Sequence, residues 1–243
     1  MKTDRIFLTA EWRYLALLNY EVNASLLLPF VPAGTELDRW DGKAFVSLIG
    51  FQFLKTRLLG FLPIPLHANF EEVNLRFYVR RQVGNELRRG VVFIRELVPR
   101  RAIAYVARTF YNENYVALPM AHELLLNADD GLRATYRWRN VKGWNSINVE
   151  TSGACELPEA GSFEQFITEH YWGYAAQPDG SSVEYQVAHP SWRVWQARGA
   201  AFEGDGEDLY RNGLATALHG RPTSAFLAEG SAVSVMRGRR LPL

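Results

Sequence analysis

Residues 70–80, FEEVNLRFYVR, decide the fold of this 243-residue chain. Apolar and polar residues alternate along this stretch, and a period of two is typical of a β-strand whose two faces differ. Gly84-Asn85 then precedes a second β-rich run, Val91–Ile94. A glycine-containing turn between two such runs predicts a β-hairpin, so we expect the two runs to be antiparallel neighbours in one sheet.

The mixture of residues on one face of this hairpin predicts that this face forms the wall of a cavity. With Gly84-Asn85 as the loop, the expected register pairs Leu75 with Ile94 and Phe77 with Val92 on one face, and Arg76 with Phe93, Tyr78 with Val91 and Asn74 with Arg95 on the other. A solvent-facing surface does not need Phe93, and a core does not accept Arg76 without a partner. Ligand sites are mostly apolar with a few polar groups, and the second face has this mixture. The alternative is a sandwich strand whose arginines lie at the rim.

A third run extends the mixed face. Ala102–Thr109 follows the turn at Val98–Arg101, and its expected register places Arg108 beside Arg76 and Tyr78. The small residues Ala102 and Ala104 leave room on that face. We therefore expect three consecutive antiparallel strands around one cavity.

Composition excludes several classes of protein. The net charge of +1 predicts no bulk attraction to nucleic acid or to an anionic membrane, so we expect neither as a partner. Charged residues near the N-terminus, such as Asp4 and Arg5, interrupt any signal-peptide core, and no apolar run is long enough to span a membrane. One cysteine, Cys155, allows no internal disulfide and is expected to be a small, partly buried residue. These features favour a cytoplasmic protein.

The rest of the chain predicts a mainly β protein without an internal repeat or a domain boundary, and therefore one domain over residues 1–243. The expected elements are a short helix at Thr9–Tyr20, a strand at Ala44–Phe53, an irregular apolar loop at Lys55–Pro65, a hairpin around Asp129-Asp130-Gly131, a capped helix from Phe163 to about Tyr174, a strand at Val183–Val187 and a frayed tail at Arg237–Arg240. Strands connected by hairpins predict a curled antiparallel β-barrel or cone with one to three packed helices, an α+β arrangement dominated by strands.

Two arginine pairs flank the first hairpin turn. Arg80-Arg81 and Arg88-Arg89 are expected to face each other across the two strands. Like charges directly opposite are unfavourable, so an acidic group such as Glu86, another part of the chain, a partner subunit or an anion should compensate them. The default interpretation is a solvated hairpin tip, where such repulsion costs little.

The chemistry-bearing residues concentrate on the mixed face. No phosphate-binding loop, dinucleotide fingerprint or nucleophile elbow is present, and the five histidines lack metal-ligand spacing, so we expect no metal and no cofactor. Glu72 shares a face with Asn74 and Arg76. A carboxylate and a guanidinium there could serve as acid/base and anchor. The alternative is a structural ion pair between two buried charges.

Several short motifs resemble one family. They are Pro32-Ala33-Gly34, Leu37-Asp38, Asp41-Gly42, Phe45-Val46-Ser47-Leu48, Glu72–Val79, Gly90–Phe93, Ala107-Arg108, Glu169-His170-Tyr171 and His189-Pro190-Ser191-Trp192. In order and spacing, over residues 8–230, the chain resembles the domain-of-unknown-function family 2071, the YqjF-like proteins. The resemblance implies the fold of acetoacetate decarboxylase, a curled antiparallel barrel or cone with a central cavity.

The resemblance does not imply the decarboxylase's activity. That enzyme uses a Schiff-base lysine, followed by a second lysine, just after the strand that matches Ala102–Thr109. This chain has Tyr111–Met120 in that region and no lysine between Lys55 and Lys142. We therefore expect no decarboxylation through a lysine Schiff base.

Two functions remain as hypotheses, both with a small molecule in the cavity. In the first, the protein is an enzyme acting on a small organic anion. Its catalytic residues are Glu72 and His189, and its substrate-binding residues are Asn74, Arg76, Tyr78, Phe93, Arg108 and Tyr111. In the second, the protein binds or senses a ligand without catalysis. A perturbed carboxylate or histidine deep in the cavity favours the enzyme, and a closed cavity with all polar groups internally paired favours binding.

A purely structural interaction protein is disfavoured, because that function leaves the mixed face of the hairpin unexplained. The sequence leaves open a homo-oligomer, the identity of the substrate and the type of reaction.

Overall fold

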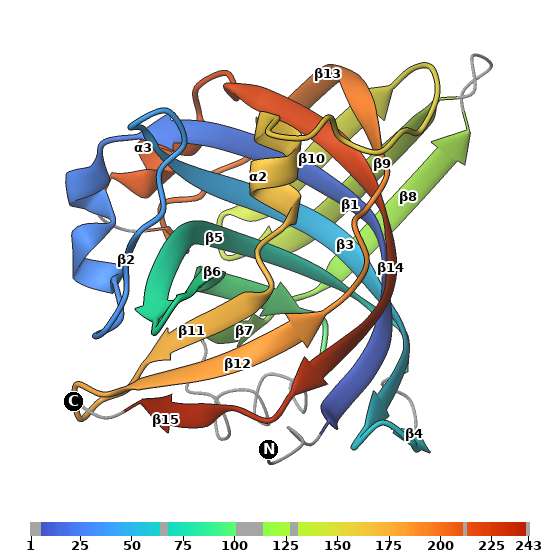
Figure 1. The fold of residues 1–243 in the computed structure, drawn as a ribbon. Coiled ribbons are helices and arrows are strands. Elements are labelled where there is room, and N and C mark those ends of the chain that lie inside the picture. Colours follow the sequence, from blue (N-terminus) through green and yellow to red (C-terminus); the bar gives the residue numbers. More distant parts are fainter. Residues whose placement is uncertain (1–5, 64–67, 101–113, 127–130, 211–212, 242–243) are drawn as a thin grey trace.

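Most of the chain forms one antiparallel sheet that curls into a cone (Figure 1). The structure is a computed structural model that describes residues 6–63, 68–100, 114–126, 131–210 and 213–241. The strands are β1 Ile6–Val22, β2 Glu36–Leu37, β3 Ala44–Leu58, β4 Leu62–Pro63, β5 Phe70–Val83, β6 Glu86–Val98, β7 Tyr115–Ala117, β8 Met120–Leu126, β9 Leu132–Asn140, β10 Gly143–Thr151, β11 Trp172–Ala176, β12 Ser182–Ala188, β13 Val194–Glu203, β14 Ser224–Met236 and β15 Arg239–Leu241. The described α-helices are α2 Phe163–Thr168 and α3 Leu214–Leu218, and two 3₁₀ turns cover Ala24–Leu26 and Leu28–Phe30.

Part of the sheet closes into a ring. Its strands are hydrogen-bonded in the order β12-β11-β6-β5-β3-β1-β14, and β14 pairs back with β12 through Val187–Val235 and Ala188–Ser234. β11 pairs with β6 in parallel, and the other neighbours in the ring are antiparallel. The ring gives β5 and β3 an inner face and an outer face, both of which are buried.

The remaining strands form a second layer outside the ring. β13, β10, β9 and β8 continue from β14 and fold back over β1 and β3 (Figure 1). The Tyr136 ring of β9 lies directly over Gly50 of β3, where a Cβ atom would come within 2.6 Å of it. The Tyr136 hydroxyl donates a hydrogen bond of 2.7 Å to the Tyr14 carbonyl. A glycine on β3 therefore lets the two layers pack closely.

The two layers produce two apolar cores. Val73, Leu75 and Phe77 belong to the core between the ring and the outer strands. The alternate residues of β5 point into the ring, where a separate cluster contains Phe51, Phe53 and Phe70. The alternation along residues 70–80 thus separates the core between the layers from the interior of the cone.

The register of the first hairpin is confirmed near the turn and wrong further away. Arg76 pairs with Phe93, Phe77 with Val92 and Tyr78 with Val91, but Leu75 pairs with Arg95 and Asn74 with Glu96. The cause is a bulge between Leu75 and Arg76 that leaves Ile94 as the extra residue on β6. The bulge places Glu96 opposite Asn74. The third run, Ala102–Thr109, lies outside the described residues.

The expected helix at Thr9–Tyr20 is wrong, because this segment is the middle of β1. Leu15 and Leu17 face the inside of the ring, whereas Ala16 and Leu18 face the outer layer. A strand buried on both faces carries apolar residues at consecutive positions and loses the period of two. The spacing of these apolar residues then matched a helical stripe by coincidence.

Other boundaries also differ from expectation. The capped helix begins as predicted, with the Ser162 hydroxyl accepting from Gln165 N, but it ends at Thr168, and Trp172–Ala176 form β11. The expected loop at Lys55–Pro65 contains the end of β3 and the short strand β4, and the expected frayed tail contains β15, which pairs with β12. The strand at Val183–Val187 and the pairing of β8 with β9 are confirmed, although residues 127–130 of the turn are not described.

The arginine pairs are confirmed, but the hairpin tip is not simply solvated. Arg80 faces Arg89, and Arg81 faces Arg88. The fully buried Glu184 of β12 accepts hydrogen bonds from Arg81 Nη1 at 3.1 Å, Arg88 Nη1 at 2.8 Å, Arg239 Nε at 2.8 Å and the Tyr174 hydroxyl at 3.0 Å. The Arg88 side chain is only 13% exposed. One carboxylate therefore joins the hairpin β5–β6 to β12 and β15 in a part-buried ionic cluster.

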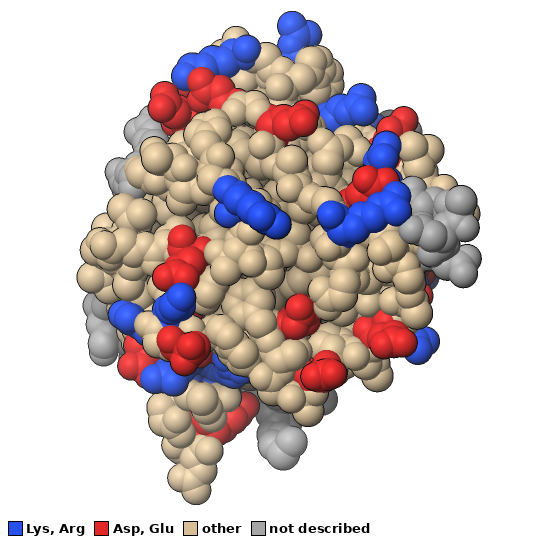
Figure 2. Space-filling model, turned by 90° about the horizontal axis from the view of Figure 1, so that it is seen from above, with Lys and Arg blue, Asp and Glu red and all other residues tan. Residues whose placement is uncertain are grey.

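The surface mixes acidic and basic side chains. Figure 2 shows both signs interspersed on one face, with wide uncharged areas between them. Within the described parts of the chain, no helix has the length and apolarity required to cross a membrane.

The Glu184 cluster predicts the effect of removing its charge. Glu184→Gln should lower the free energy of unfolding by about 3 kcal/mol, because Arg81, Arg88 and Arg239 then lose the buried carboxylate that compensates their charges. Glu86→Gln is the matched control, since Glu86 also pairs with Arg88 but its side chain is 55% exposed, and we expect less than about 1 kcal/mol. Urea unfolding of both variants measures the difference. Equal effects from the two substitutions would contradict a special role for Glu184.

Candidate functional site

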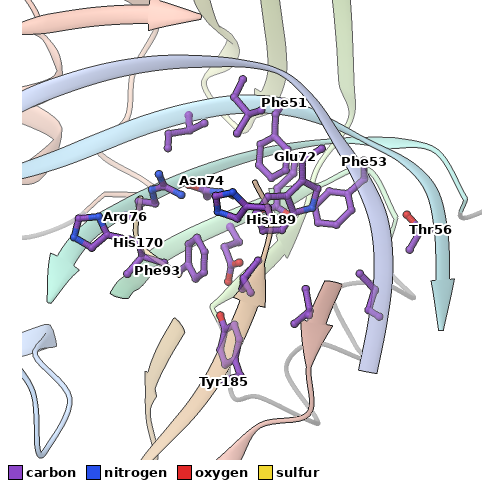
Figure 3. A pocket seen from close by; sticks show the side chains of 18 of the residues that line it. Phe51, Phe53, Thr56, Glu72, Asn74, Arg76, Phe93, His170, Tyr185 and His189 are labelled. Carbon is purple, nitrogen blue, oxygen red and sulfur yellow. The ribbon is translucent and has the colours of Figure 1, made fainter. Parts of the chain in front are cut away.

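The cone encloses a cavity of about 250 Å³ (Figure 3). Inward-facing residues of the ring strands line it, together with Tyr115 of β7 and the residues that follow α2. Most of the lining is apolar and aromatic, including Trp12, Phe51, Phe53, Phe93, Tyr185 and Trp192. Trp12 packs edge-on against Phe51 at 5.5 Å and Phe53 at 5.6 Å between ring centroids. A few polar groups interrupt this aromatic wall, and these groups define the candidate site.

The structure brings most of the predicted site residues together. Glu72, Asn74, Arg76, Phe93 and His189 all line the cavity. They come from β5, from β6 and from the segment after β12, so residues more than 100 positions apart in the chain meet there. Arg108 and Tyr111 lie outside the described residues.

Tyr78 is the exception, and the expectation that it lines the cavity is wrong. Its ring lies 4.7 Å from the ring of His170 and 5.4 Å from that of Phe166, both contributed by the region of α2. Its hydroxyl makes a hydrogen bond of 2.5 Å with the buried Ser47 hydroxyl. The helix therefore covers Tyr78 and places His170 in front of it.

Arg76 is a buried cation in the cavity wall. The residue is 8% exposed, and its Nη2 donates to the Ile167 carbonyl at 3.2 Å. Its Nε has no hydrogen-bond partner, and no carboxylate of the described chain lies within 4.0 Å of the guanidinium. Buried charges are normally paired, so this guanidinium is suited to an anion that enters the cavity.

Glu72 and Asn74 form a hydrogen-bonded pair beside Arg76. Glu72 is 3% exposed and accepts from Asn74 Nδ2 at 3.1 Å and from the Tyr115 hydroxyl at 3.2 Å. Burial raises the pKa of Glu72 to about 7, although the hydrogen bonds from Asn74 and Tyr115 and the charge of Arg76 oppose the shift. Glu72 can therefore both hold and release a proton near neutral pH. Asn74 Oδ1 has no partner among the described residues.

Glu96 and His170 line the cavity but were not among the predicted site residues. Glu96 is 2% exposed and lines the cavity, because the bulge in the hairpin turns it inward opposite Asn74. His170 also lines the cavity, and its Nε2 is 3.0 Å from Asp38 Oδ2. The motif Glu169-His170-Tyr171 was the available signal for His170, but an expected helix through Tyr174 concealed its position.

His189 lies against aromatic rings. It stacks on Trp192 at 4.1 Å and packs against Tyr171 at 4.8 Å between centroids. Its Nδ1 is 2.8 Å from the Pro190 carbonyl, so Nδ1 carries the proton and Nε2 is left as an acceptor. Burial lowers the pKa of His189, which favours the neutral ring.

Arg76 and His170 mark one end of the cavity, which is termed the polar end. Figure 3 shows these two residues on one side and Thr56 on the opposite side, with Glu72, Phe51 and Phe53 between them. Thr56 is buried, and its hydroxyl has no partner among the described residues. This arrangement suits a molecule with a charged group near Arg76 and an apolar body against Phe51 and Phe53.

The residues present do not suggest a metal or a lysine-based site. In the described segments, no three His, Cys, Asp or Glu side chains gather closely enough to hold a metal ion. Lys43 pairs with Glu21, Lys55 with Glu11 and Lys142 with Asp205, all with exposed ammonium groups. None of these three lysines lines the cavity.

Comparison with known sequences gives the family. The family profile described as an uncharacterized conserved protein, DUF2071, matches residues 9–232. The chain belongs to this family. It is also 30% identical over 186 residues to the uncharacterized protein YqjF of Bacillus subtilis (strain 168), covering 76% of this chain and 74% of that protein. The resemblance drawn from the short motifs is thereby confirmed.

Comparison with solved structures confirms the fold. Acetoacetate decarboxylase from Legionella pneumophila aligns with a TM-score of 0.68 at 12% identity, covering 97% of this chain and 87% of that chain. An acetoacetate decarboxylase-like enzyme from Sphingomonas wittichii RW1 gives 0.66 at 12% identity, covering 99% and 94%. The enduracididine biosynthesis enzyme MppR, complexed with pyruvate, gives 0.64 at 13% identity, covering 100% and 92%. At such low identity the likeness shows the architecture alone.

The raised pKa of Glu72 predicts a change of stability with pH. Between about pH 4.5 and 7 the Glu72 carboxyl has lost its proton in the unfolded chain but keeps it in the folded chain. The free energy of unfolding therefore decreases as the pH rises through this range. Glu72→Gln should therefore gain stability relative to the wild type, by roughly 3 kcal/mol between pH 4.5 and 8. Thermal and urea unfolding at several pH values measure the gain.

Glu71 on the opposite face of β5 is the control. Its hydrogen bond to His122 holds the pKa of Glu71 below its usual value despite burial, so its contribution to stability is lost as the pH falls. Glu71→Gln should lose stability relative to the wild type as the pH rises. If both variants followed the same pH trend, the burial of Glu72 would not be the cause.

Proposed function

We propose that this protein binds a small organic anion in the cavity of the cone and that Glu72 acts on it as an acid or base. Arg76 holds the carboxylate, and the aromatic residues around Phe51, Phe53 and Trp12 hold the apolar body. The observation that carries the proposal is the buried Arg76 guanidinium, which has no carboxylate within 4.0 Å among the described residues.

The anchor role follows from the cost of a buried charge. A guanidinium removed from water is stabilised by hydrogen bonds and by an opposite charge, and among the described residues Arg76 donates a hydrogen bond to the Ile167 carbonyl. A carboxylate can accept from the unpartnered Nε and supply the missing charge. Asn74, with its unpartnered Oδ1, stands next to this point on the strand.

The acid or base role follows from the position and the pKa of Glu72. Its pKa of about 7 is suited to proton transfer at neutral pH, and it lines the same cavity as Arg76. A perturbed carboxylate deep in a cavity and several polar atoms without partners favour an enzyme over a closed binding pocket. His189 is a second candidate for proton transfer through its Nε2. Arg108 and Tyr111 stay candidates for ligand contacts.

The names of two fold neighbours agree with this ligand class. One is an acetoacetate decarboxylase, and another was solved with pyruvate. Both names refer to small carboxylates, which is the class that Arg76 would hold.

Non-catalytic binding or sensing is the second candidate. The mostly aromatic lining favours it, because ligand-binding cavities need few polar groups. Turnover of a bound ligand separates the two candidates: an enzyme converts a bound acid, and Glu72→Gln abolishes that conversion without abolishing binding.

The anchor role predicts the effect of a charge-preserving substitution. Arg76→Lys should weaken binding of small aromatic carboxylates at least tenfold, because the ammonium cannot reproduce the planar fork of the guanidinium. Arg80→Lys is the matched control on the same strand, since Arg80 pairs with Glu36 outside the cavity and its side chain is 42% exposed. Calorimetric titration measures both, after native mass spectrometry of freshly purified protein has identified any retained ligand. Unchanged affinity in Arg76→Lys would contradict the anchor role.

A double substitution tests whether Arg76 has only a structural role. If Arg76 only compensates Glu72, the double substitution Glu72→Gln with Arg76→Gln should recover the stability that Arg76→Gln loses, and ligand affinity should equal that of the wild type. If Arg76 is the anchor, affinity stays low in the double variant whatever happens to its stability.

The positions of the lysines predict a negative result. Because the exposed Lys43, Lys55 and Lys142 pair with surface carboxylates and do not line the cavity, borohydride should trap no adduct with acetoacetate or pyruvate. Intact-protein mass spectrometry after reduction makes the measurement. A substrate-dependent mass gain located on one of these lysines by peptide mapping would contradict this prediction.

A further inference from the structure

Asp38 and His170 form a buried pair at the polar end of the cavity. Asp38 follows β2, and His170 follows α2, 132 positions later in the chain. Both side chains are almost fully buried, at 4% and 1% exposure. Asp38 Oδ2 is 3.0 Å from His170 Nε2 and also accepts from Arg89 Nε at 2.6 Å. The backbone N–H of Asp38 donates to the Tyr78 carbonyl at 3.0 Å, which fixes the carboxylate to β5.

This arrangement decides which nitrogen of His170 carries the proton. Burial raises the pKa of Asp38, but the hydrogen bonds from His170 and Arg89 outweigh it and hold that pKa below its usual value, so the group is a carboxylate. Burial lowers the pKa of His170 to about 4, so its ring is neutral. A neutral imidazole has one donor and one acceptor nitrogen, and only a donor can bond to a carboxylate. Nε2 therefore carries the proton, and Nδ1 presents a lone pair.

The lone pair of His170 Nδ1 has no partner in the described parts of the chain. The atom is buried, and no donor among the described residues reaches it. The rings of Tyr78 and Phe166 pack against the imidazole at 4.7 and 5.1 Å and hold its orientation. His170 lies beside Arg76 at the cavity wall in Figure 3, and the charge of Arg76 is close enough to act on the ring. The lining of one cavity thus includes a guanidinium donor and a neutral imidazole acceptor.

We infer that His170 Nδ1 accepts a hydrogen bond from the ligand, and that the ligand is a 2-hydroxy acid, with its carboxylate on Arg76 and its hydroxyl on His170. This inference rests on the proposed function, because it takes Arg76 as the carboxylate anchor. A hydroxyl on the carbon next to the carboxylate can donate to the acceptor while the carboxylate stays on the guanidinium. A 2-oxo acid would instead place an acceptor against the lone pair of Nδ1. Asp38 is a positioning residue, because it fixes the tautomer of His170 and touches no ligand.

Three aromatic acids that differ only at this carbon test the inference. Mandelate carries a hydroxyl, phenylacetate carries two hydrogens and benzoylformate carries a carbonyl, and all three offer a phenyl ring to the aromatic wall. Calorimetric titration of the full chain should give one enantiomer of mandelate the highest affinity, roughly tenfold above phenylacetate and more above benzoylformate. If none of the three binds, the anion site itself fails, and the inference fails with it. If all three bind equally, the anion site stands and the inference is overturned.

The tautomer can be reversed by substituting Asp38 together with Arg89, because Arg89 Nε donates to the same oxygen that faces His170. In the double substitution Asp38→Asn with Arg89→Gln, the amide of residue 38 is free to donate to His170 Nε2, so that Nδ1 takes the proton and becomes a donor. Benzoylformate should then gain about tenfold in affinity relative to mandelate. Arg89→Gln is the matched control, since it removes the same ion pair to Asp38 but keeps the carboxylate on Nε2. It should leave the wild-type order of affinities unchanged. If both variants changed the preference between mandelate and benzoylformate in the same way, the role of the tautomer would be overturned.

A measurement on the unmodified protein keeps the inference testable if the double variant does not fold. Nitrogen-15 NMR of protein labelled in its imidazole rings distinguishes a protonated ring nitrogen from an unprotonated one. Assigned through His170→Gln, the His170 signals should show a protonated Nε2 and an unprotonated Nδ1, and mandelate should shift the Nδ1 signal. A protonated Nδ1 in the free protein, or an Nδ1 signal unmoved by bound mandelate, would overturn the inference.

Discussion

The closure of the sheet between β12 and β14 is the constraint on which the site depends. Without that pairing, β5 and β3 would belong to an open sheet with one face toward solvent, and Arg76 and Glu72 could be hydrated there. With it, the inner face becomes the wall of a cavity in which both side chains are buried. Burial then raises the pKa of Glu72, and among the described residues no carboxylate lies within 4.0 Å of the Arg76 guanidinium. The electrostatics of the cavity are therefore a consequence of the topology.

A second ionic cluster supports this closure from outside the cavity. Glu184 on β12 binds arginines from both strands of the β5–β6 hairpin and from β15. Asp38 also connects separate elements, because it joins Arg89 of β6 to His170 after α2. These carboxylates lie close to the hairpin whose inner face carries Glu72, Asn74 and Arg76. The arginine-rich tip of the hairpin thus acts mainly in structure, whereas Arg76 on the same hairpin lines the cavity.

The sequence predicted the parts of the fold in which one face of a strand differs from the other. Residues 70–80 show the alternation clearly, and the hairpin, its turn and most of its register followed from it. The same reasoning failed for β1, because both of its faces are buried and its apolar residues are consecutive. It also failed for Glu96 and for the pair Asp38–His170. A bulge shifts pairing without any local signal, and a contact across 132 positions depends on closure of the whole sheet.

A crystal structure of the protein grown with phenylacetate tests the central claim most directly. The account predicts a carboxylate oxygen within about 3 Å of Arg76 Nε and the phenyl ring against Phe51 and Phe53. A cavity without the acid, in which Arg76 instead forms an ion pair with Glu72 or Glu96, would contradict it.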